Sequence, residues 1–266
     1  MHTNPKHYSV LVNLSDLHYG KTTPSFNTRL FESRLKNFAK AIVRLSRLLP
    51  EEGDTVGEII VSLNGDLVDG ESIYSYHDAV NQTSVIRQAR GAAKILQKFI
   101  KYLYVNTDAT HMTVLGTRGN HGRMSHEANP ESNWDSVCID LVEAGIGETF
   151  MKPVRFKTTL EPYLIYQPQH SDHKILIEHE GVKDAQTPAK MMKVLNKLLM
   201  TNSSILVNGH WHKTQYRKFW DFHHVVNGTI VTDDDYAFTI GAEAECVQTV
   251  LFLQGKNVYF HKIDCR

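Results

Sequence analysis

The sequence predicts an α/β protein with two β-sheets and helices packed outside them. Apolar spacing indicates a strand, a helix and a strand between residues 8 and 63, then a second long helix before a third strand at 112–115. A right-handed strand–helix–strand connection makes the first two strands parallel. From residue 150 the expected strands become short and closely spaced. No repeat, low-complexity tract or linker divides the 266 residues, so we expect a single domain over residues 1–266.

Two long helices are expected in the first half, over 27–49 and about 82–104, because their apolar residues recur at helical spacing. Each also carries a basic face. Stripes of lysine and arginine are one way in which proteins contact polyanions, although most such stripes are simply solvated. The basic residues are Arg29, Arg34, Lys36, Lys40, Arg44 and Arg47 in the first helix, and Arg87, Arg90, Lys94, Lys98 and Lys101 in the second.

The second half of the chain predicts shorter elements. Asn133 is expected to cap a helix that stops at Gly145. Thr187 and Pro188 are expected to begin another helix. Strands are expected at 154–158, 163–167, 174–178, 222–227, 247–253 and 258–263.

Composition and charge limit the possible classes of function. The formal net charge is zero, which excludes a globally basic nucleic-acid binder but not a local basic patch. Cys138, Cys246 and Cys265 are too few and too scattered for a disulfide framework, which suggests a reducing compartment. The sequence shows no secretory signal pattern and no apolar run near the roughly 18 residues of a membrane span. We therefore expect a soluble, cytoplasmic protein with no membrane contact.

Polar motifs follow five of the expected strands. A single Asp-Gly motif after a strand is more often an ordinary turn than a site. Five motifs together are different, because the carboxyl ends of strands in α/β proteins face the ligand-binding crevice. The motifs supply Asp16 and His18, Asp66 and Asp69, Asn120 and His121, His179, and finally His210 and His212.

These residue types predict a metal site. Carboxylate, amide and imidazole ligands without thiolates suit Mn²⁺, Fe or Zn²⁺ better than Ca²⁺ or a structural zinc. Six or seven ligands exceed what one open catalytic ion needs, so two ions that share a bridging carboxylate are expected. Such a pair is suited to in-line attack of water on phosphorus.

The order of the motifs, DxH at Asp16, GDxxD at Gly65, GNH at Gly119, the lone His179 and GHxH at Gly209, resembles the calcineurin-like metallophosphoesterase family. The resemblance covers nearly the whole chain. It implies a four-layer αββα sandwich in which two central mixed β-sheets are flanked by helices.

The resemblance also implies a role for each motif residue. Asp16, His18 and His212 would bind the first metal, and Asp66 would bridge to the second. Asn120, His179 and His210 would hold the second metal. His121 would protonate the leaving oxygen or stabilise the transition state, and Asp69 would orient it.

Departures from the family pattern bear on the substrate. Gly70 and Gly122 stand where the protein phosphatases of the family carry an arginine and an acid, so a phosphoprotein phosphatase is disfavoured. Three stretches resemble bacteriophage-encoded phosphoesterases related to double-strand-break-repair nucleases: 119–123, 133–135, and 227–229 followed by 235–237. Arg123 and Lys183 are candidates to bind substrate phosphate.

The lone histidine also departs from the pattern. Glu180 separates His179 from the glycine that more often follows directly in the family. The choice of His179 over His170 or His173 therefore rests on the strand that precedes it.

We therefore expect a hydrolase with two divalent ions, Mn²⁺ first and Fe or Zn²⁺ as alternatives, that cleaves phosphodiester bonds of nucleic acid, with DNA favoured. One alternative is a phosphatase or phosphodiesterase for nucleotides or other small phosphate esters. Another is a catalytically idle scaffold that binds a partner, which predicts missing ligands, whereas none is missing. The oligomeric state is open, a homodimer included. For a phage-encoded protein the location would be the host cell cytoplasm.

Overall fold

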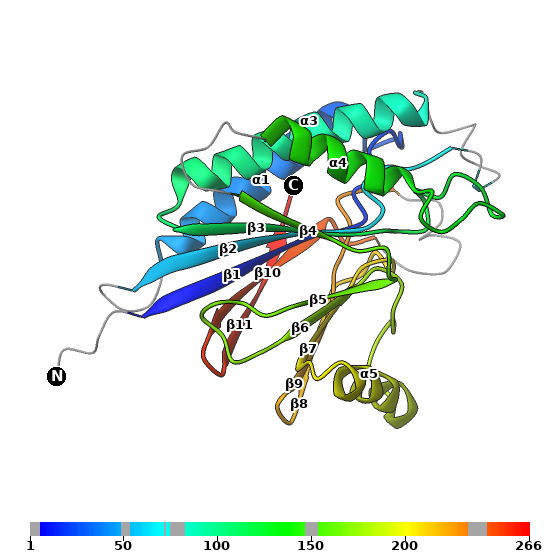
Figure 1. The fold of residues 1–266 in the computed structure, drawn as a ribbon. Coiled ribbons are helices and arrows are strands. Elements are labelled where there is room, and N and C mark those ends of the chain that lie inside the picture. Colours follow the sequence, from blue (N-terminus) through cyan, green and yellow to red (C-terminus); the bar gives the residue numbers. More distant parts are fainter. Residues whose placement is uncertain (1–5, 49–53, 72, 75–82, 147–153, 234–243) are drawn as a thin grey trace.

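The computed structural model describes residues 6–48, 54–71, 73–74, 83–146, 154–233 and 244–266, which form two β-sheets between helices (Figure 1). In the first sheet the strand order is β11-β10-β1-β2-β3-β4. The strands β1 to β4 are parallel. At one edge β10 runs antiparallel to β1, and β11 runs antiparallel to β10. The bounds are β1 His7–Leu14, β2 Thr55–Asn64, β3 His111–Thr117, β4 Val154–Thr158, β10 Val247–Gln254 and β11 Asn257–Asp264.

The second sheet has the order β5-β6-β7-β9-β8. The central strands β6, β7 and β9 are parallel, and the edge strands β5 and β8 are antiparallel to their neighbours. Both sheets are therefore mixed. The bounds are β5 Tyr163–Tyr166, β6 Ile175–Glu178, β7 Ile205–Asn208, β8 Gln215–Phe219 and β9 Phe222–Val226. The sequence did not predict β8, because no residue of this edge strand is buried and its pattern is largely polar.

Alternation along the central strands of the first sheet separates two apolar cores, since neighbouring residues of a strand point to opposite faces. Val12 and Val61 belong to the core beneath α1, α3 and α4. Leu11 and Ile60, one position earlier in each strand, belong to the core between the two sheets. The helices of the first core are α1 Thr28–Ser46, α3 Val85–Asn106 and α4 Trp134–Ile146.

The outer face of the second sheet is covered by α5, Pro188–Met200 (Figure 1). Val194 and Leu198 of this helix are buried against Leu206 of β7. Helices, sheet, sheet and helix thus follow one another with an apolar core between each pair. The predicted four-layer αββα sandwich is confirmed.

Two helices begin at residues whose side chains cap the first turn, and for α5 this was expected from the sequence. The Asn27 side chain accepts hydrogen bonds from the backbone N–H groups of Arg29 and Leu30, at 3.0 and 3.1 Å, and so caps α1. The Thr187 side chain accepts from Lys190 and caps α5, with Pro188 in its first turn. Residues 49, 82 and 235–237, which also entered the predictions, lie outside the described residues.

Two local predictions were wrong. Gly145 does not stop α4, which continues to Ile146. Gly145 instead allows close packing, because a Cβ at this position would lie 2.0 Å from Nε2 of Gln97. Arg34 does not belong to the basic solvent face of α1. Its guanidinium is buried and donates hydrogen bonds to the carbonyl of Ile230 and, at 3.1 Å, to the hydroxyl of Thr232.

Across the ranges described above, no helix combines the length and the apolarity that crossing a membrane requires.

Candidate metal centre

The candidate centre lies where the chain leaves the carboxyl ends of β1, β2 and β3 in the first sheet and of β6 and β7 in the second. Among the residues that the structure describes, ligand-type side chains from all five loops form three groups, two of which share His18, and within each group the ligand atoms lie within 4.8 Å of one another. The groups are Asp16 with His18 and His212, His18 with Asp69 and His121, and Asp66 with His179 and His210.

Backbone hydrogen bonds join the first two loops directly. The N–H groups of Leu17 and His18 both donate to the carbonyl of Asp66, at 2.8 and 2.9 Å, and the N–H of Asp16 donates to the carbonyl of Gly65 at 3.2 Å. These bonds continue the pairing of β1 with β2 beyond the ends of the strands. The two motifs therefore hold one another in place.

Left-handed backbone recurs at the centre. Five of the motif residues have positive φ angles of 46 to 73°, which ordinary side chains rarely adopt. Such positions cost on the order of 1–3 kcal/mol each, and they persist where the surrounding contacts enforce them, commonly at functional sites. The residues are Asp16, His18, Asp66, His210 and His212.

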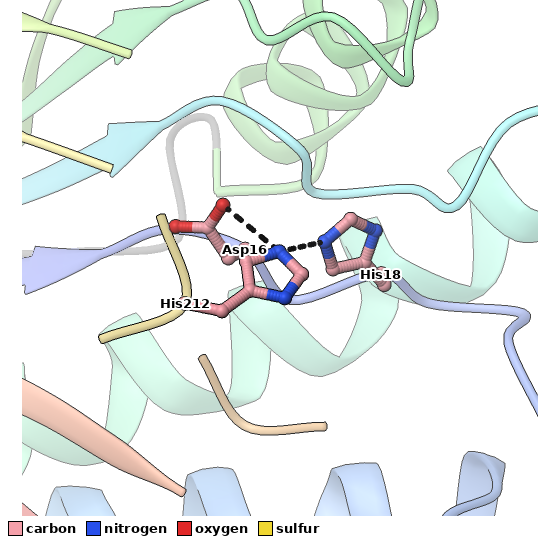
Figure 2. Close-up of side chains that lie close together, drawn as sticks. All are labelled: Asp16, His18 and His212. Carbon is pink, nitrogen blue, oxygen red and sulfur yellow. Dashed lines mark hydrogen bonds and ion pairs between the residues drawn. The ribbon is translucent and has the colours of Figure 1, made fainter. Parts of the chain in front are cut away.

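In the first group, imidazole nitrogens and a carboxylate converge on one point (Figure 2). The Nε2 atom of His212 lies 3.0 Å from Nε2 of His18 and 3.5 Å from Oδ1 of Asp16. The Nδ1 atom of His18 faces Oδ1 of Asp69 at 3.1 Å. A carboxylate that accepts a hydrogen bond from Nδ1 turns the lone pair of Nε2 inward, as in many metal sites.

His179 lies at the centre of the third group, which it forms with Asp66 and His210. Its Nδ1 atom donates to the carbonyl of Asn64 at 2.8 Å, which directs Nε2 at Asp66 Oδ2, 3.0 Å away, and at Asp16 Oδ1, 3.9 Å away. Within the described part of the chain this buried Nε2 completes no hydrogen bond of ordinary geometry. A buried nitrogen aimed at two carboxylates is the arrangement expected of a metal ligand, so the donor set fits divalent ions.

Charge at the centre favours the ionised carboxylates. Burial alone would raise the pKa of Asp66, but His179 and His121 lower it well below its usual range. The pKa of Asp16 is likewise lowered against the effect of burial, chiefly by His212 and His179. Burial opposes the charged form of His179, yet Asp66 and Asp16 raise its pKa to about 10.

Asn120 and His210 meet at the rim. The Nδ1 atom of His210 lies 2.8 Å from Oδ1 of Asn120, and the backbone N–H of His210 donates to both carboxylate oxygens of Asp16, at 2.9 and 3.0 Å. The Asn120 side-chain amide donates to the hydroxyl of Tyr74 at 2.7 Å, which fixes its oxygen toward the centre. Tyr74 carries no signal in the sequence, because it lies in a segment without periodicity or motif.

His121 is oriented mainly by a backbone group. Its Nδ1 atom lies 2.9 Å from the carbonyl oxygen of Asp69 and 3.6 Å from Oδ1 of the same residue, whereas that carboxylate oxygen is closer to His18, at 3.1 Å. Burial lowers the pKa of His121 to about 4. Although burial opposes it, His18 lowers the pKa of Asp69 to about 2. The carboxylate of Asp69 therefore supports His18 at least as directly as it supports His121.

Asp135 fixes the second and third loops and was missed as a functional residue. Its buried carboxylate accepts hydrogen bonds from the backbone N–H groups of Asp66, Leu67 and Gly119, each at 2.9 Å, and from Val68 at 3.3 Å. Burial and the nearby Asp66 raise its pKa to about 6, against the effect of these donors. In the sequence this residue stood out only as part of the stretch 133–135, without a role of its own.

The substrate-binding candidates lie at the edge of the centre. Arg123 is part-exposed and forms an ion pair with Glu180 at 2.9 Å, across the gap between the third and fourth loops. The Nζ atom of Lys183 lies 5.3 Å from the ring centroid of Trp211. The alternative His173 lies before β6, at the opposite end of that strand from His179, and contacts Ser204. The structure thus places His179, not His173, among the ligand-type residues.

No protein-family model and no curated protein matches the sequence. Solved structures do match. They include GAP50, described as the anchor in the inner membrane complex of Plasmodium, which is 10% identical with a TM-score of 0.50 over 97% of this chain and 85% of that one. A conserved uncharacterised protein of Streptococcus pneumoniae, described as a predicted phosphoesterase, is 10% identical over 97% and 90% of the two chains, with a TM-score of 0.42. An archaeal phosphodiesterase is 11% identical over 96% and 98%, with a TM-score of 0.40. At these identities the likeness is one of fold.

Proposed function

We propose that this protein is a metal-dependent phosphoesterase that holds two divalent ions and hydrolyses phosphodiester bonds. The observation that carries the proposal is the convergence of two buried ligand groups, Asp16 with His18 and His212, and Asp66 with His179 and His210, joined through the Nε2 atom of His179. Ions bound there would polarise the phosphoryl oxygens and activate a water for in-line attack. Mn²⁺ is the proposed ion, with Fe or Zn²⁺ as alternatives.

The protein residues around the ions have separate tasks in this proposal. Asp66 would help to hold both ions, and its Oδ1 atom accepts the backbone N–H of His121 at 2.8 Å. The Nδ1–H group of His121 donates to the Asp69 carbonyl, so a second proton on this ring would sit on Nε2. The negative charge of a bound phosphate would favour that protonated form, in which Nε2–H donates to the phosphoryl or leaving oxygen. Asn120 and His210 close the second position. Arg123 would bind a non-bridging phosphate oxygen once Glu180 is displaced.

The proposed substrate is nucleic acid, with DNA favoured. The basic residues of α3 are exposed, as a surface that contacts a polyanion requires. A second candidate, hydrolysis of nucleotides or other small phosphate esters, is favoured by Glu180, because its carboxylate neutralises Arg123 at the rim and would repel a polyanion. The exposed basic residues of α3 are Arg87, Arg90, Lys94, Lys98 and Lys101.

The proposal includes a single domain over residues 1–266 and action in the cytoplasm, or in the host cell cytoplasm for a phage-encoded protein. A metal-free scaffold that binds a protein partner is disfavoured, because every residue of the expected ligand set is present and gathered at one rim.

Substrate and metal are tested together. The protein is stripped of metal, loaded with Mn²⁺, and assayed on labelled single- and double-stranded DNA beside a panel of nucleotides. We expect about two bound ions per chain and cleavage of DNA. Strong turnover of nucleotides with intact DNA would support the second candidate. Fewer than about one ion per chain, with no hydrolysis of either class, would contradict the enzyme proposal and favour the scaffold.

A further inference from the structure

We propose that Trp211 forms a stacking subsite beside the proposed metal centre, and that this subsite binds the base of a nucleoside esterified to the scissile phosphate. The inference rests on the proposed function and narrows its substrate class from phosphodiesters in general to esters of nucleosides. It follows from the position of the Trp211 ring, the hollow that it borders and the charges around that hollow.

The position of the ring is fixed against the centre. Trp211 stands between His210 and His212 in the chain, and its ring centroid lies 4.9 Å from that of His210 at an interplanar angle of 78°. Its Nε1–H donates to the carbonyl of Gly181 at 3.1 Å, which ties it to the loop that carries His179. The loops after β6 and β7 therefore hold the indole next to a proposed metal ligand.

Trp211 and His210 together line one side of an open hollow of about 600 Å³, which lies within the range of small-ligand sites. Because His210 belongs both to this hollow and to the second ligand group, a molecule that occupies the hollow lies directly beside the proposed metals. The remaining lining residues are Glu180, Gly181, Val182, Lys193, Asn196 and Lys197.

Charge around the hollow favours an anionic ligand with a flat ring, because Glu180 in its lining is paired with Arg123, and Lys197 with Glu178, so that the lysines beside the indole dominate. Lys183 places its ammonium group 5.3 Å from the centroid of the indole, in the arrangement of a cation–π contact. Lys193 is exposed at the wall of the hollow and forms no ion pair with any residue that the structure describes. An indole between such lysines suits a nucleobase with its phosphates, since every base presents a π-face for stacking. An ester that carries a methyl group in place of the nucleoside would gain nothing from this stacking.

The test compares two esters with the same leaving group, thymidine 5′-(p-nitrophenyl phosphate) and methyl p-nitrophenyl phosphate, on the Mn²⁺-loaded full chain. We expect Trp211→Ala to lower kcat/KM for the thymidine ester by about tenfold, the usual loss for one base–aromatic stack, and to leave the methyl ester within about twofold. Trp211→Phe should retain most of the preference for the nucleoside. Trp220, which is 70% exposed between β8 and β9, supplies the matched control Trp220→Ala, with no effect on either ester.

Equal losses for the two esters in Trp211→Ala would overturn the inference, because they would show that the indole only supports His210 and His212. Equal efficiency of the wild-type protein toward both esters would overturn it as well.

A binding measurement separates this inference from the proposed function. Calorimetric titration with thymidine 5′-monophosphate should show about tenfold weaker binding in Trp211→Ala and unchanged binding in Trp220→Ala, whether or not any ester is hydrolysed. If neither ester is cleaved but this difference is found, the proposed function fails and the subsite stands. If binding is the same in both variants, the subsite is refuted.

Discussion

At the scale of single residues, the centre depends on side chains held in unusual positions. Asp16, His18 and Asp66 take left-handed backbone angles, and the loops secure them by hydrogen bonds among themselves. The consequence is that their carboxylates and imidazole point inward, buried from solvent. Strain of this kind is tolerated only where neighbouring contacts enforce it, and here those contacts come from other motifs of the same centre.

Asp66→Asn tests the bridging role. An amide keeps the shape of the side chain but removes the charge that both proposed ions would share. We expect activity to become undetectable and Mn²⁺ affinity to fall by at least about 10- to 100-fold, the loss typical even for groups that only support metal ligands. Metal analysis and phosphodiester hydrolysis measure the two effects. Full activity with two ions retained would contradict the role.

His121→Ala tests the assignment of His121 as a residue that acts on the substrate. Loss of a positioned proton donor or hydrogen-bond donor lowers kcat by about 10²- to 10⁴-fold. Both metal ions should remain bound, because this side chain belongs to neither of the two groups proposed to hold them, which are Asp16 with His18 and His212, and Asp66 with His179 and His210. The measurements are kcat and metal content. A variant that had lost an ion would show that His121 is a ligand.

At the scale of elements, the site is held together by groups that lie outside the motifs. The carboxylate of Asp135, in the first turn of α4, accepts backbone hydrogen bonds from the loops after β2 and β3. Gly119 is required where these loops meet, because a Cβ there would lie 2.1 Å from Oδ1 of Asp66. The helix thus positions two loops without itself contributing a ligand.

Asp135→Ala should destabilise the fold and the centre together. The substitution leaves buried N–H groups of Asp66, Leu67 and Gly119 without their acceptor, at a cost of about 1–3 kcal/mol for each unpaired group. We expect the free energy of unfolding to fall by about 3 kcal/mol or more, with weaker Mn²⁺ binding. Denaturant unfolding and metal titration check this. Asp135→Asn, which keeps one acceptor oxygen, should lose less.

His224 in β9 should make stability depend on pH. Burial lowers its pKa to about 4, and its Nε2 atom contacts Oδ1 of Asn208 at 2.8 Å. In the unfolded chain His224 binds a proton near pH 6.5, whereas in the folded chain it does so only near pH 4. The folded protein is therefore most favoured above pH 6.5, and its free energy of unfolding decreases as the pH falls from there toward 4. Between pH 7 and 5 we expect His224→Gln to lose about 2 kcal/mol less stability than the wild type. The measurement is the free energy of unfolding as a function of pH, and parallel curves for the wild type and His224→Gln would contradict this prediction.

At the scale of the whole molecule, the centre exists only because the two sheets pack face to face. Asp16 and Asp66 come from the first sheet, and His179 and His210 from the second. The core between the sheets, which includes Leu11 and Ile60, therefore sets the spacing of the two ligand groups. The site belongs to the assembled sandwich rather than to either sheet.

Metal binding should therefore stabilise the whole fold. An ion that binds only the folded chain adds about 2.7 kcal/mol of stability at 100 times its Kd. We expect Mn²⁺ to raise the Tm of the wild type and a chelator to lower it again. His210→Ala should show a clearly smaller rise. Thermal unfolding with and without Mn²⁺ is the measurement, and an unchanged Tm in the wild type would contradict two bound ions.

Local patterns in the sequence predicted much of this architecture. Continuous apolar runs located the strands around Val12 and Val61, and helical spacing located α1 and α3 to within a few residues. Edge strand β8 was missed because half-exposed residues leave no apolar pattern. Arg34 was misplaced because periodicity does not show that a guanidinium can be buried against carbonyl groups from a distant segment.

By itself, the sequence determined the fold class and the five motifs that supply Asp16, Asp66, Asn120, His179 and His210, because periodicity and strand-end chemistry are local properties. Tertiary structure alone decided the roles of the remaining groups. Asp135 lies 69 residues from Asp66, and Tyr74 lies 46 residues from Asn120. Contacts over such distances depend on how the layers pack, and packing leaves no periodic trace in the chain.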